Sequence, residues 1–312
     1  MKLNRKLLTE TWAVWLISLI CCLLWGSAFP CIKIGYELFS IGSGETASQI
    51  LFAGVRFTLA GVMTVLIGSI IEKKILIPKK ESIAKVITLS LFQTIGQYVF
   101  FYIGLAFSTG SKSSIISGTG TFIAILISCF IFRQERFNTR KAFGCIAGFA
   151  GIIVINLTPD MQLSFSIGDL YILISAVSAA FSVAFIKKFS QFENPVVLSG
   201  YQFFVGGVIM TAAGLAFGGK MSFCGAKSVA LLIYMGMISA VAYSLWGILL
   251  KFNPVSRIAI FKFMIPVFGV TLSSLLIREE SASLGWTTIV ALILVCAGII
   301  SVSRAKDSNH VN

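Results

Sequence analysis

Apolar residues fill this chain in long runs that polar residues interrupt only briefly. A helix of about 20 residues crosses a bilayer core of about 30 Å, and ten runs reach or nearly reach that length. They cover residues 12–34, 47–71, 83–107, 113–132, 139–157, 167–186, 196–217, 229–250, 255–277 and 284–303. Barrel strands are shorter and alternate in polarity, so only helices fit these runs. The pattern predicts an all-α polytopic membrane protein with ten transmembrane helices.

The second half of the chain repeats the pattern of the first half at constant spacing. An offset of 145 residues aligns Tyr98 with Tyr243, Arg133 with Arg278 and Glu135 with Glu280, and an offset of 146 aligns Gly54 with Gly200 and Gly61 with Gly207. Five helices per copy would invert the second copy in the membrane. We therefore predict two inverted five-helix repeats over 12–157 and 167–304, an arrangement typical of secondary transporters with a site between the repeats.

Charge sets the orientation of these helices. The formal net charge of +13 raises the possibility of nucleic-acid binding, but no soluble face interleaves basic and aromatic residues. With the N-terminus in the cytoplasm, the outer side holds only five basic residues, and 18 of the 25 lie inside. The outer five are Lys33, Lys112, Lys220, Lys227 and Arg278, while Arg56 and Lys262 lie within helices. The positive-inside rule then predicts a cell-membrane protein with both termini cytoplasmic.

The residue types that catalysis and metal binding need do not converge in the predicted helices. Glu37 and Glu45 fall in a loop, Asp169 begins a helix, and Glu135 and Glu280 end helices. The single histidine is His310 in the tail, and the seven cysteines suit helix packing better than metal or redox chemistry. The glycine spacing around Gly110-Ser-Lys112 does not fit a phosphate-binding loop. We therefore predict no enzyme activity, no cofactor and no metal.

Four stretches of the chain resemble a known transporter family. They are "LLWGSAFPCIKIG" (23–35), "AGVRFTLAG" (53–61), "FFYIGLAFSTGSKSSII" (100–116) and "FRQER" (132–136). Together they resemble EamA-type members of the drug/metabolite transporter superfamily, over about 12–304 as two EamA units. The resemblance implies ten helices around a central cavity and transport of a small organic solute, such as export of an amino acid or related metabolite. A channel or a sensory protein is the alternative, which inverted duplication disfavours.

The second copy departs from the family pattern at two places. Trp25 and Gly26 have no counterpart in "SAAFSVAFIKK" (178–188), and Gln202 stands where the first copy has Arg56. These departures keep the identity of the solute open.

Several polar and aromatic residues are candidates for the cavity lining. Burying an amide without a partner costs about 2–7 kcal/mol, so such groups face a cavity or another polar group. Gln93 and Gln97 lie four residues apart and are expected to share a helix face. The repeat pairs the helix that carries these glutamines with the helix of Tyr243. The cavity candidates are Trp25, Gln93, Gln97, Tyr98, Tyr243, Trp246 and Lys262.

Arg56 and Lys262 are the two charges placed well inside predicted helices. A charge within the membrane is by default a functional hypothesis. Arg56 has a structural alternative, and Lys262, about 10 Å from its helix start, can instead extend its amine to the cytoplasmic surface. With both cations and no buried carboxylate, we expect an electropositive cavity that favours a carboxylate-bearing or zwitterionic solute. Lys262 is also the candidate proton carrier.

Prolines and small residues suggest bends and close contacts. Pro30, four residues after Gly26, removes one helical hydrogen bond and marks either a bend that opens during transport or a static kink. Pro266 allows the same two interpretations. The pair Gly144 and Gly148 indicates a close helix contact, either within the chain or in a homodimer.

Overall fold

The computed structural model describes residues 5–42, 44–108, 110–156, 166–223, 225–277 and 286–304, and every regular element in these ranges is helical. The α-helices are α1 (Arg5–Thr9), α2 (Thr11–Leu38), α3 (Thr46–Glu72), α4 (Ile83–Leu89), α5 (Gln97–Ala106), α6 (Gly110–Leu126), α7 (Thr139–Asn156), α8 (Ile167–Phe189), α9 (Pro195–Ala216), α10 (Ala226–Phe252), α11 (Val255–Ala259), α12 (Met264–Ile277) and α13 (Trp286–Ser303). Two 3-10 segments, η1 (Lys80–Ser82) and η4 (Ile260–Phe263), and two π-helical segments, η2 (Ser90–Gly96) and η3 (Ile127–Ile131), join some of them.

The helices have the length and surface of membrane spans. Seven stretches of the described chain are long and apolar enough to cross a bilayer, namely Thr11–Leu38, Thr46–Glu72, Lys80–Leu105, Ile167–Phe189, Pro195–Ala216, Ala226–Phe252 and Val255–Ser273. Ile115–Ile131 and Ile289–Ser303 are shorter apolar helices. Large apolar side chains point outward, among them Leu66, Ile146 and Ile293, which are 58%, 69% and 62% exposed. Such a surface suits lipid, so the prediction of an all-α, multi-pass membrane protein is confirmed.

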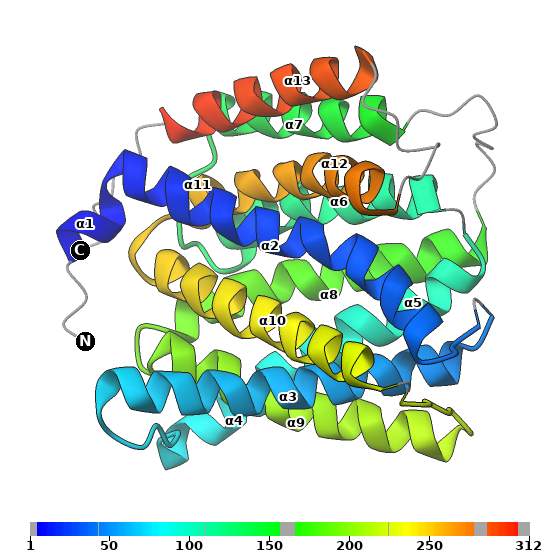
Figure 1. Ribbon diagram of the computed structural model, residues 1–312. Helices are drawn as coiled ribbons and strands as arrows, with labels where there is room; N and C mark the ends of the chain where they lie inside the picture. The colour runs from blue at the N-terminus through cyan, green and yellow to red at the C-terminus, as the bar shows by residue number, and fades with distance from the viewer. Residues whose placement is uncertain are drawn as a thin grey trace.

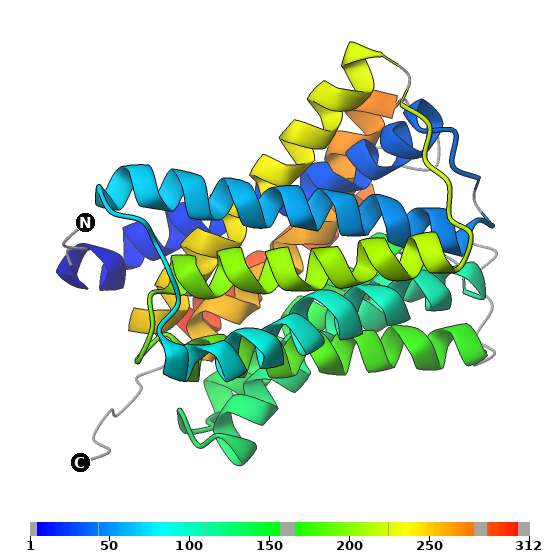
Figure 2. The same ribbon diagram turned by 90° about the horizontal axis from the view of Figure 1, so that it is seen from below.

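The first long helix begins and the last helix ends at the same end of the bundle, which we call the basic end. Helix α2 begins there and α13 ends there, as Figure 1 shows, and the turned view of Figure 2 agrees. Helices α3, α8 and α10 also finish at this end, where Lys73, Lys188 and Lys251 lie. Basic residues at a helix C-terminus complement the partial negative charge of the helix dipole.

Two helix pairs pack along their length, α3 with α9 and α7 with α13 (Figure 1). In the first pair the backbones touch at glycines. A Cβ atom added to Gly61 would lie 2.4 Å from the amide nitrogen of Phe204, and one added to Gly207 would lie 2.3 Å from that of Thr58. No larger residue fits there unless a backbone moves. We call this contact between α3 and α9 the glycine seam.

Helix α7 uses its small residues in the same way. A Cβ atom on Gly144 would lie 2.8 Å from the carbonyl oxygen of Gly298 in α13, and one on Gly148 would meet the ring of Phe263. The close contacts predicted for this helix are therefore made within the chain. A homodimer stays a prediction, and it would need another face of the protein.

Two irregular segments interrupt the inner helices. The single helix predicted over 255–277 consists of α11, the 3-10 segment η4 and α12, which differs from the prediction. Pro266 has no amide hydrogen to bond the carbonyl of Lys262 four residues earlier, and this missing bond favours local rewinding. In η2, the Ser178 hydroxyl donates a hydrogen bond of 2.8 Å to the Phe92 carbonyl oxygen. Both η2 and η4 contribute side chains to the centre of the bundle.

Helices α2 and α8 make matching sets of neighbours. Helix α2 packs against α10 and α12, and α8 packs against α5 and α6. Helix α2 runs unbroken through Pro30, and a Cβ on Gly26 would lie 2.6 Å from the Cβ of Phe268 in α12. Gly26 is thus a point of close packing between these two helices.

Candidate functional site

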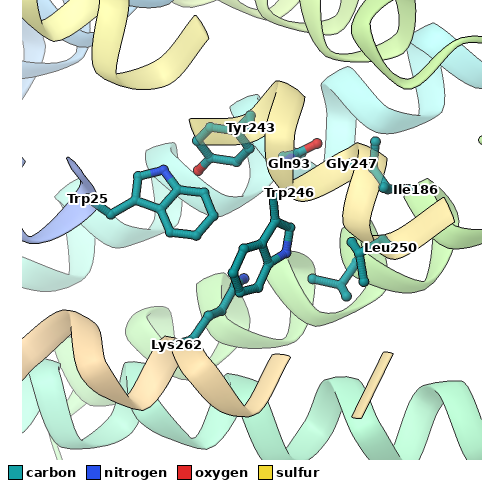
Figure 3. Close-up of a pocket in the computed structure, with 9 residues that line it drawn as sticks. Trp25, Gln93, Ile186, Tyr243, Trp246, Gly247, Leu250 and Lys262 are labelled. Atoms are coloured by element: carbon teal, nitrogen blue, oxygen red, sulfur yellow. The ribbon is translucent and has the colours of Figure 1, made fainter. Parts of the chain in front are cut away.

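A small pocket lies between α2, α8, α10, η2 and η4, at the middle of the bundle. Its lining residues are Trp25, Gln93, Val183, Ile186, Tyr243, Trp246, Gly247, Leu250 and Lys262 (Figure 3). Its volume is about 10 Å³. That is about the space of one water molecule, so a larger solute fits only if the helices part. We call it the central pocket.

Lys262 is the one charged side chain in the lining. Its position in η4 lets its amine reach the pocket, where the nitrogen lies 5.9 Å from the ring centroid of Trp25 and 5.8 Å from that of Trp246. Figure 3 shows the side chain pointing toward the Trp246 ring. No hydrogen bond or ion pair joins this amine to another residue of the described chain. Ring faces attract a cation but leave its three hydrogen-bond donors available.

Other polar atoms in the pocket are also without partners. The indole nitrogens of Trp25 and Trp246 and the side-chain oxygen of Gln93 are buried, and none has a hydrogen-bond partner within the described residues. Leaving a buried donor or acceptor unpaired costs about 1–3 kcal/mol, so such atoms need an explanation. Trp25, Gln93 and Trp246 line the same pocket as Lys262. The two indole N–H groups and the Lys262 amine are donors that suit an anionic oxygen, whereas the Gln93 oxygen is an acceptor and needs a donor.

Aromatic rings connect the pocket to the rest of the bundle. The Trp25 ring makes edge contacts with Tyr243 and Trp246 at centroid distances of 4.9 and 5.0 Å. The hydroxyls of Tyr98 and Tyr243 share a hydrogen bond of 2.9 Å. These tyrosines are separated by 145 residues, which is the repeat offset found in the sequence. Residues at matching positions of the two halves therefore meet directly at the centre.

Arg56 lies close to this pair of tyrosines but outside the pocket lining. Its side chain is 4% exposed, and its guanidinium carbon lies 4.3 Å from the Phe57 ring and 5.9 Å from the Tyr98 ring. The Nε atom is buried and has no hydrogen-bond partner in the described part of the protein. Packing on Phe57 supports a structural role for Arg56. A structural role does not explain why the buried Nε atom has no hydrogen-bond partner among the described residues.

Most of the residues predicted to line a cavity do come together. Trp25, Gln93, Tyr243, Trp246 and Lys262 line the central pocket, and Tyr98 bonds to Tyr243. Gln97 does not line it. The two glutamines were expected to share a face, but the π-helical turn of η2 changes the angle between residues four apart.

The sequence did not predict the apolar wall of the pocket. Val183 and Ile186 of α8 and Leu250 of α10 line it, and Gly247 leaves it space. Apolar residues carry no chemical signal in so apolar a chain. Leu250 stands four residues after Trp246, and that helical spacing was the one available indication.

Pro266 acts on the site indirectly, through the 3-10 turn that carries Lys262. Pro30 and Gly26 belong to the same helix as Trp25 but do not line the pocket, and Gly26 packs against α12.

Comparison with known proteins agrees with this architecture. A crystal structure superposes with a TM-score of 0.74 over 94% of this chain and 96% of that chain, at 15% identity, which shows a shared fold. An uncharacterized transporter of Archaeoglobus fulgidus is 26% identical over 94% of this chain and 99% of its own length. A protein of Escherichia coli named a probable amino-acid metabolite efflux pump is 21% identical, covering 91% of this chain and 92% of that protein.

The family assignment comes from a sequence profile. The profile of the EamA-like transporter family matches residues 11–157 and again residues 166–304, which together make up nearly the whole chain. The names of the family and of these relatives indicate transporters rather than enzymes. This chain, a multi-pass membrane protein, belongs to the EamA-like transporter family.

Proposed function

We propose that this transporter carries a small organic solute with a carboxylate group, an amino acid or a related metabolite, by secondary transport and in the export direction. One observation carries the proposal, namely the Lys262 amine inside the central pocket with no carboxylate of the described chain beside it. A carboxylate of the solute would supply the missing acceptor. The name of the Escherichia coli relative supports the solute class.

The repeat architecture supports alternating access as the mechanism. We propose ten transmembrane helices in two inverted five-helix repeats, over 12–157 and 167–304. The two family matches fall on these halves. The helix contacts keep their pattern when the halves are exchanged, since α3 packs on α9, α7 packs on α13, and α2 and α8 have corresponding neighbours. In such a carrier the halves rock around a site between them.

The size of the central pocket requires movement. A space of about 10 Å³ does not hold an amino acid, so we propose that this structure is a closed state of the carrier. Opening would separate α2 from α10 and α12, whose side chains now meet around Trp25. Pro30 and Pro266 lie on these moving helices. We propose that they supply the bends, because each leaves one helical hydrogen bond unmade.

The decisive experiment is transport by purified protein in liposomes. A thermal-shift screen over amino acids first selects a solute that stabilises the protein, and counterflow of that labelled solute then separates a carrier from a channel. Lys262→Met should abolish binding and transport while the protein stays folded. Lys262→Arg keeps the charge and should bind the solute, but it resists deprotonation and should lose any proton coupling. Normal transport by Lys262→Met at every pH would contradict the proposal.

A matched control is available at Lys188. This lysine also lies near an aromatic ring, with its amine 5.7 Å from the Phe132 centroid, but it is outside the central pocket. Lys188→Met should transport normally. Loss of transport in both variants would point to the general positive charge rather than to the pocket.

Orientation is tested separately. We propose that both termini lie in the cytoplasm, from the charge distribution. Reporter fusions after residue 162 and after Asn312 should report the outside and the inside, respectively. Finding both reporters on one side would overturn the ten-helix arrangement.

A further inference from the structure

We infer that Arg56 forms a second anion-binding site, which receives the carboxylate of the solute on the far side of the Tyr98–Tyr243 pair from Lys262. The inference extends the proposed function and rests on it for the identity of the anion. Its physical basis is independent, because it starts from a buried cation that the fold does not neutralise.

The guanidinium of Arg56 is buried among neutral groups. Its side chain is 4% exposed, no ion pair with a carboxylate of the described chain involves it, and its Nε is without a hydrogen-bond acceptor. Burying an uncompensated charge is costly, and contact with the Phe57 ring returns only about 0.5–2 kcal/mol of that cost. A carboxylate would bind the planar guanidinium through two parallel hydrogen bonds and satisfy it.

Tyrosine side chains lie near this cation. The Tyr98 ring lies under it, and Tyr36 and Tyr102 lie within its electrostatic reach. A tyrosine hydroxyl can donate to an anion and accept from arginine, so it suits a site that is alternately filled and empty. These residues come from α2, α3 and α5 in the half of the bundle away from the basic end.

The corresponding position in the second half is built differently. Gln202 aligns with Arg56, and its side-chain oxygen accepts a 2.5 Å hydrogen bond from the Thr94 hydroxyl. The second half thus fills this position with a neutral side chain whose oxygen is tied into the packing. The two halves therefore differ in charge at this position.

A continuous series of contacts links the two cations. Lys262 lies against Trp25, Trp25 against Tyr243, Tyr243 bonds to Tyr98, and Tyr98 lies under Arg56, with each separation below 6 Å. The Tyr98–Tyr243 hydrogen bond is the only polar link in the series and stands between the cations. In this arrangement the carboxylate would leave Lys262, pass the parted tyrosines and meet Arg56.

The test measures the charge of the Arg56 site directly. Tyr36→Cys places a thiol in it, and the full-length protein in liposomes is treated with 2-sulfonatoethyl or 2-(trimethylammonio)ethyl methanethiosulfonate. Mass spectrometry follows the modification of residue 36 alone. Phe107→Cys, at a side chain that is 61% exposed, corrects for the intrinsic reactivity of the two reagents. We expect the anionic reagent to be favoured by about tenfold or more, because a nearby cation in protein surroundings contributes at least that factor.

Arg56 variants decide the outcome. Arg56→Gln, which copies the residue at the matching position, should reduce the anion preference to that of the control, and Arg56→Lys should keep it. Sodium propionate should slow labelling when Arg56 is present and should have no such effect in Arg56→Gln. An anion preference that is unchanged by Arg56→Gln, or absent from the start, overturns the inference. If Tyr36→Cys folds poorly, the native thiol of Cys31 is the second reporter, because Arg56 also acts on it electrostatically.

Tryptophan fluorescence separates this inference from the proposed function. Trp25 and Trp246 line the central pocket, so propionate bound at Lys262 should change their emission. Arg56→Gln should keep this response and lose net transport, and Lys262→Met should lose the response. If the unmodified protein shows no response, the proposed function fails, while the labelling result still decides whether Arg56 makes an anion site.

Discussion

Lys141 and Lys262 are both lysines inside the helical bundle, and they differ in what their amines contact. Lys141 is fully buried at the start of α7, where its amine donates 2.7 Å hydrogen bonds to the Glu135 carboxylate and to the Arg136 carbonyl oxygen. Glu135 in turn accepts a 2.9 Å hydrogen bond from the Ser256 amide and another from its hydroxyl. The Lys262 amine lies over the rings of Trp25 and Trp246 and makes no hydrogen bond or ion pair in the described chain.

Lys141 is a cation that stabilises the fold, whereas the Lys262 amine is free of acceptors from the described chain and can bind a ligand. The Lys141 network joins the loop before α7 to α11, so it fixes two segments from different halves of the chain. Breaking a buried ion pair is costly because the remaining charge stays buried. Removing Lys262 leaves no buried carboxylate of the described chain without its cation. Its removal should therefore affect binding much more than folding.

The largest effect on stability is expected at Lys141. Lys141→Met leaves the Glu135 carboxylate buried without its cation, which should lower the free energy of unfolding by about 3–5 kcal/mol. Lys262→Met should change it by less than about 1 kcal/mol, because a methionine fills the same apolar surroundings. Unfolding of both purified variants in detergent measures the difference. Equal stability of the two variants would break the comparison.

The glycine seam should show the next largest effect. Gly61→Ala places a Cβ atom 2.4 Å from a backbone nitrogen of α9, so the helices must move apart, at a cost of about 1–3 kcal/mol. Gly44→Ala is the control, because no atom lies within 4 Å of an added Cβ there. The melting temperature should fall only in the first variant. A normal melting temperature for Gly61→Ala would show that α3 and α9 are not in tight contact.

A double-mutant cycle tests whether the central tyrosines depend on one another. Tyr98→Phe or Tyr243→Phe alone leaves the other buried hydroxyl without a partner, at a cost of about 1 kcal/mol. The double variant removes both hydroxyls and should be nearly as stable as the unmodified protein. Additive losses in the unfolding free energy would mean that the hydroxyls have separate roles. The same proteins, assayed for transport, show whether this hydrogen bond slows passage between the two cations.

The fold was more predictable from the sequence than the site. Long apolar runs indicate membrane helices directly, and glycines aligned at constant spacing indicate the repeat. The all-α membrane architecture could therefore be predicted from the sequence. The sequence predicted part of the set of residues around Lys262, because polar side chains stand out in an apolar chain. The π-helical turn at Gln93 was not predictable, since it depends on contacts between helices such as Ser178 with Phe92. For the 3-10 turn at Lys262, Pro266 predicted a bend but not the type of turn.

The partners of the buried charges were also hidden from the sequence. Glu135 and Ser256 are separated by 121 residues and meet through the arrangement of α11 beside the loop that precedes α7. No local pattern shows such a contact. Likewise, the sequence placed Lys262 where its amine could reach either the surface or the interior, and the side-chain direction in the folded protein favours the interior.

The smallest expected effect concerns the connection between α8 and α9 at the basic end. Glu193 accepts hydrogen bonds of 2.9 Å from the Asn194 amide and 3.1 Å from the Lys79 amide. Burial acts to raise the pKa of Glu193, but these hydrogen bonds, one from Ser82 and the Lys79 charge lower it overall. The ionised carboxylate therefore contributes stability above its ordinary pKa of about 4.3, and this contribution is lost as the pH falls through the lower pKa of the folded state.

The variant Glu193→Gln tests whether the ionised carboxylate stabilises the folded protein. The variant should be less stable than the unmodified protein at neutral pH, and the difference in unfolding free energy should shrink as the pH falls below about 4. Thermal unfolding in detergent across this pH range measures it. The effect should be well below that of Lys141→Met, because Glu193 is held by hydrogen bonds from backbone amides, whereas removing Lys141 leaves a buried carboxylate without its cation. A difference that grows toward acid would mean that burial, and not the amides, controls this carboxyl group.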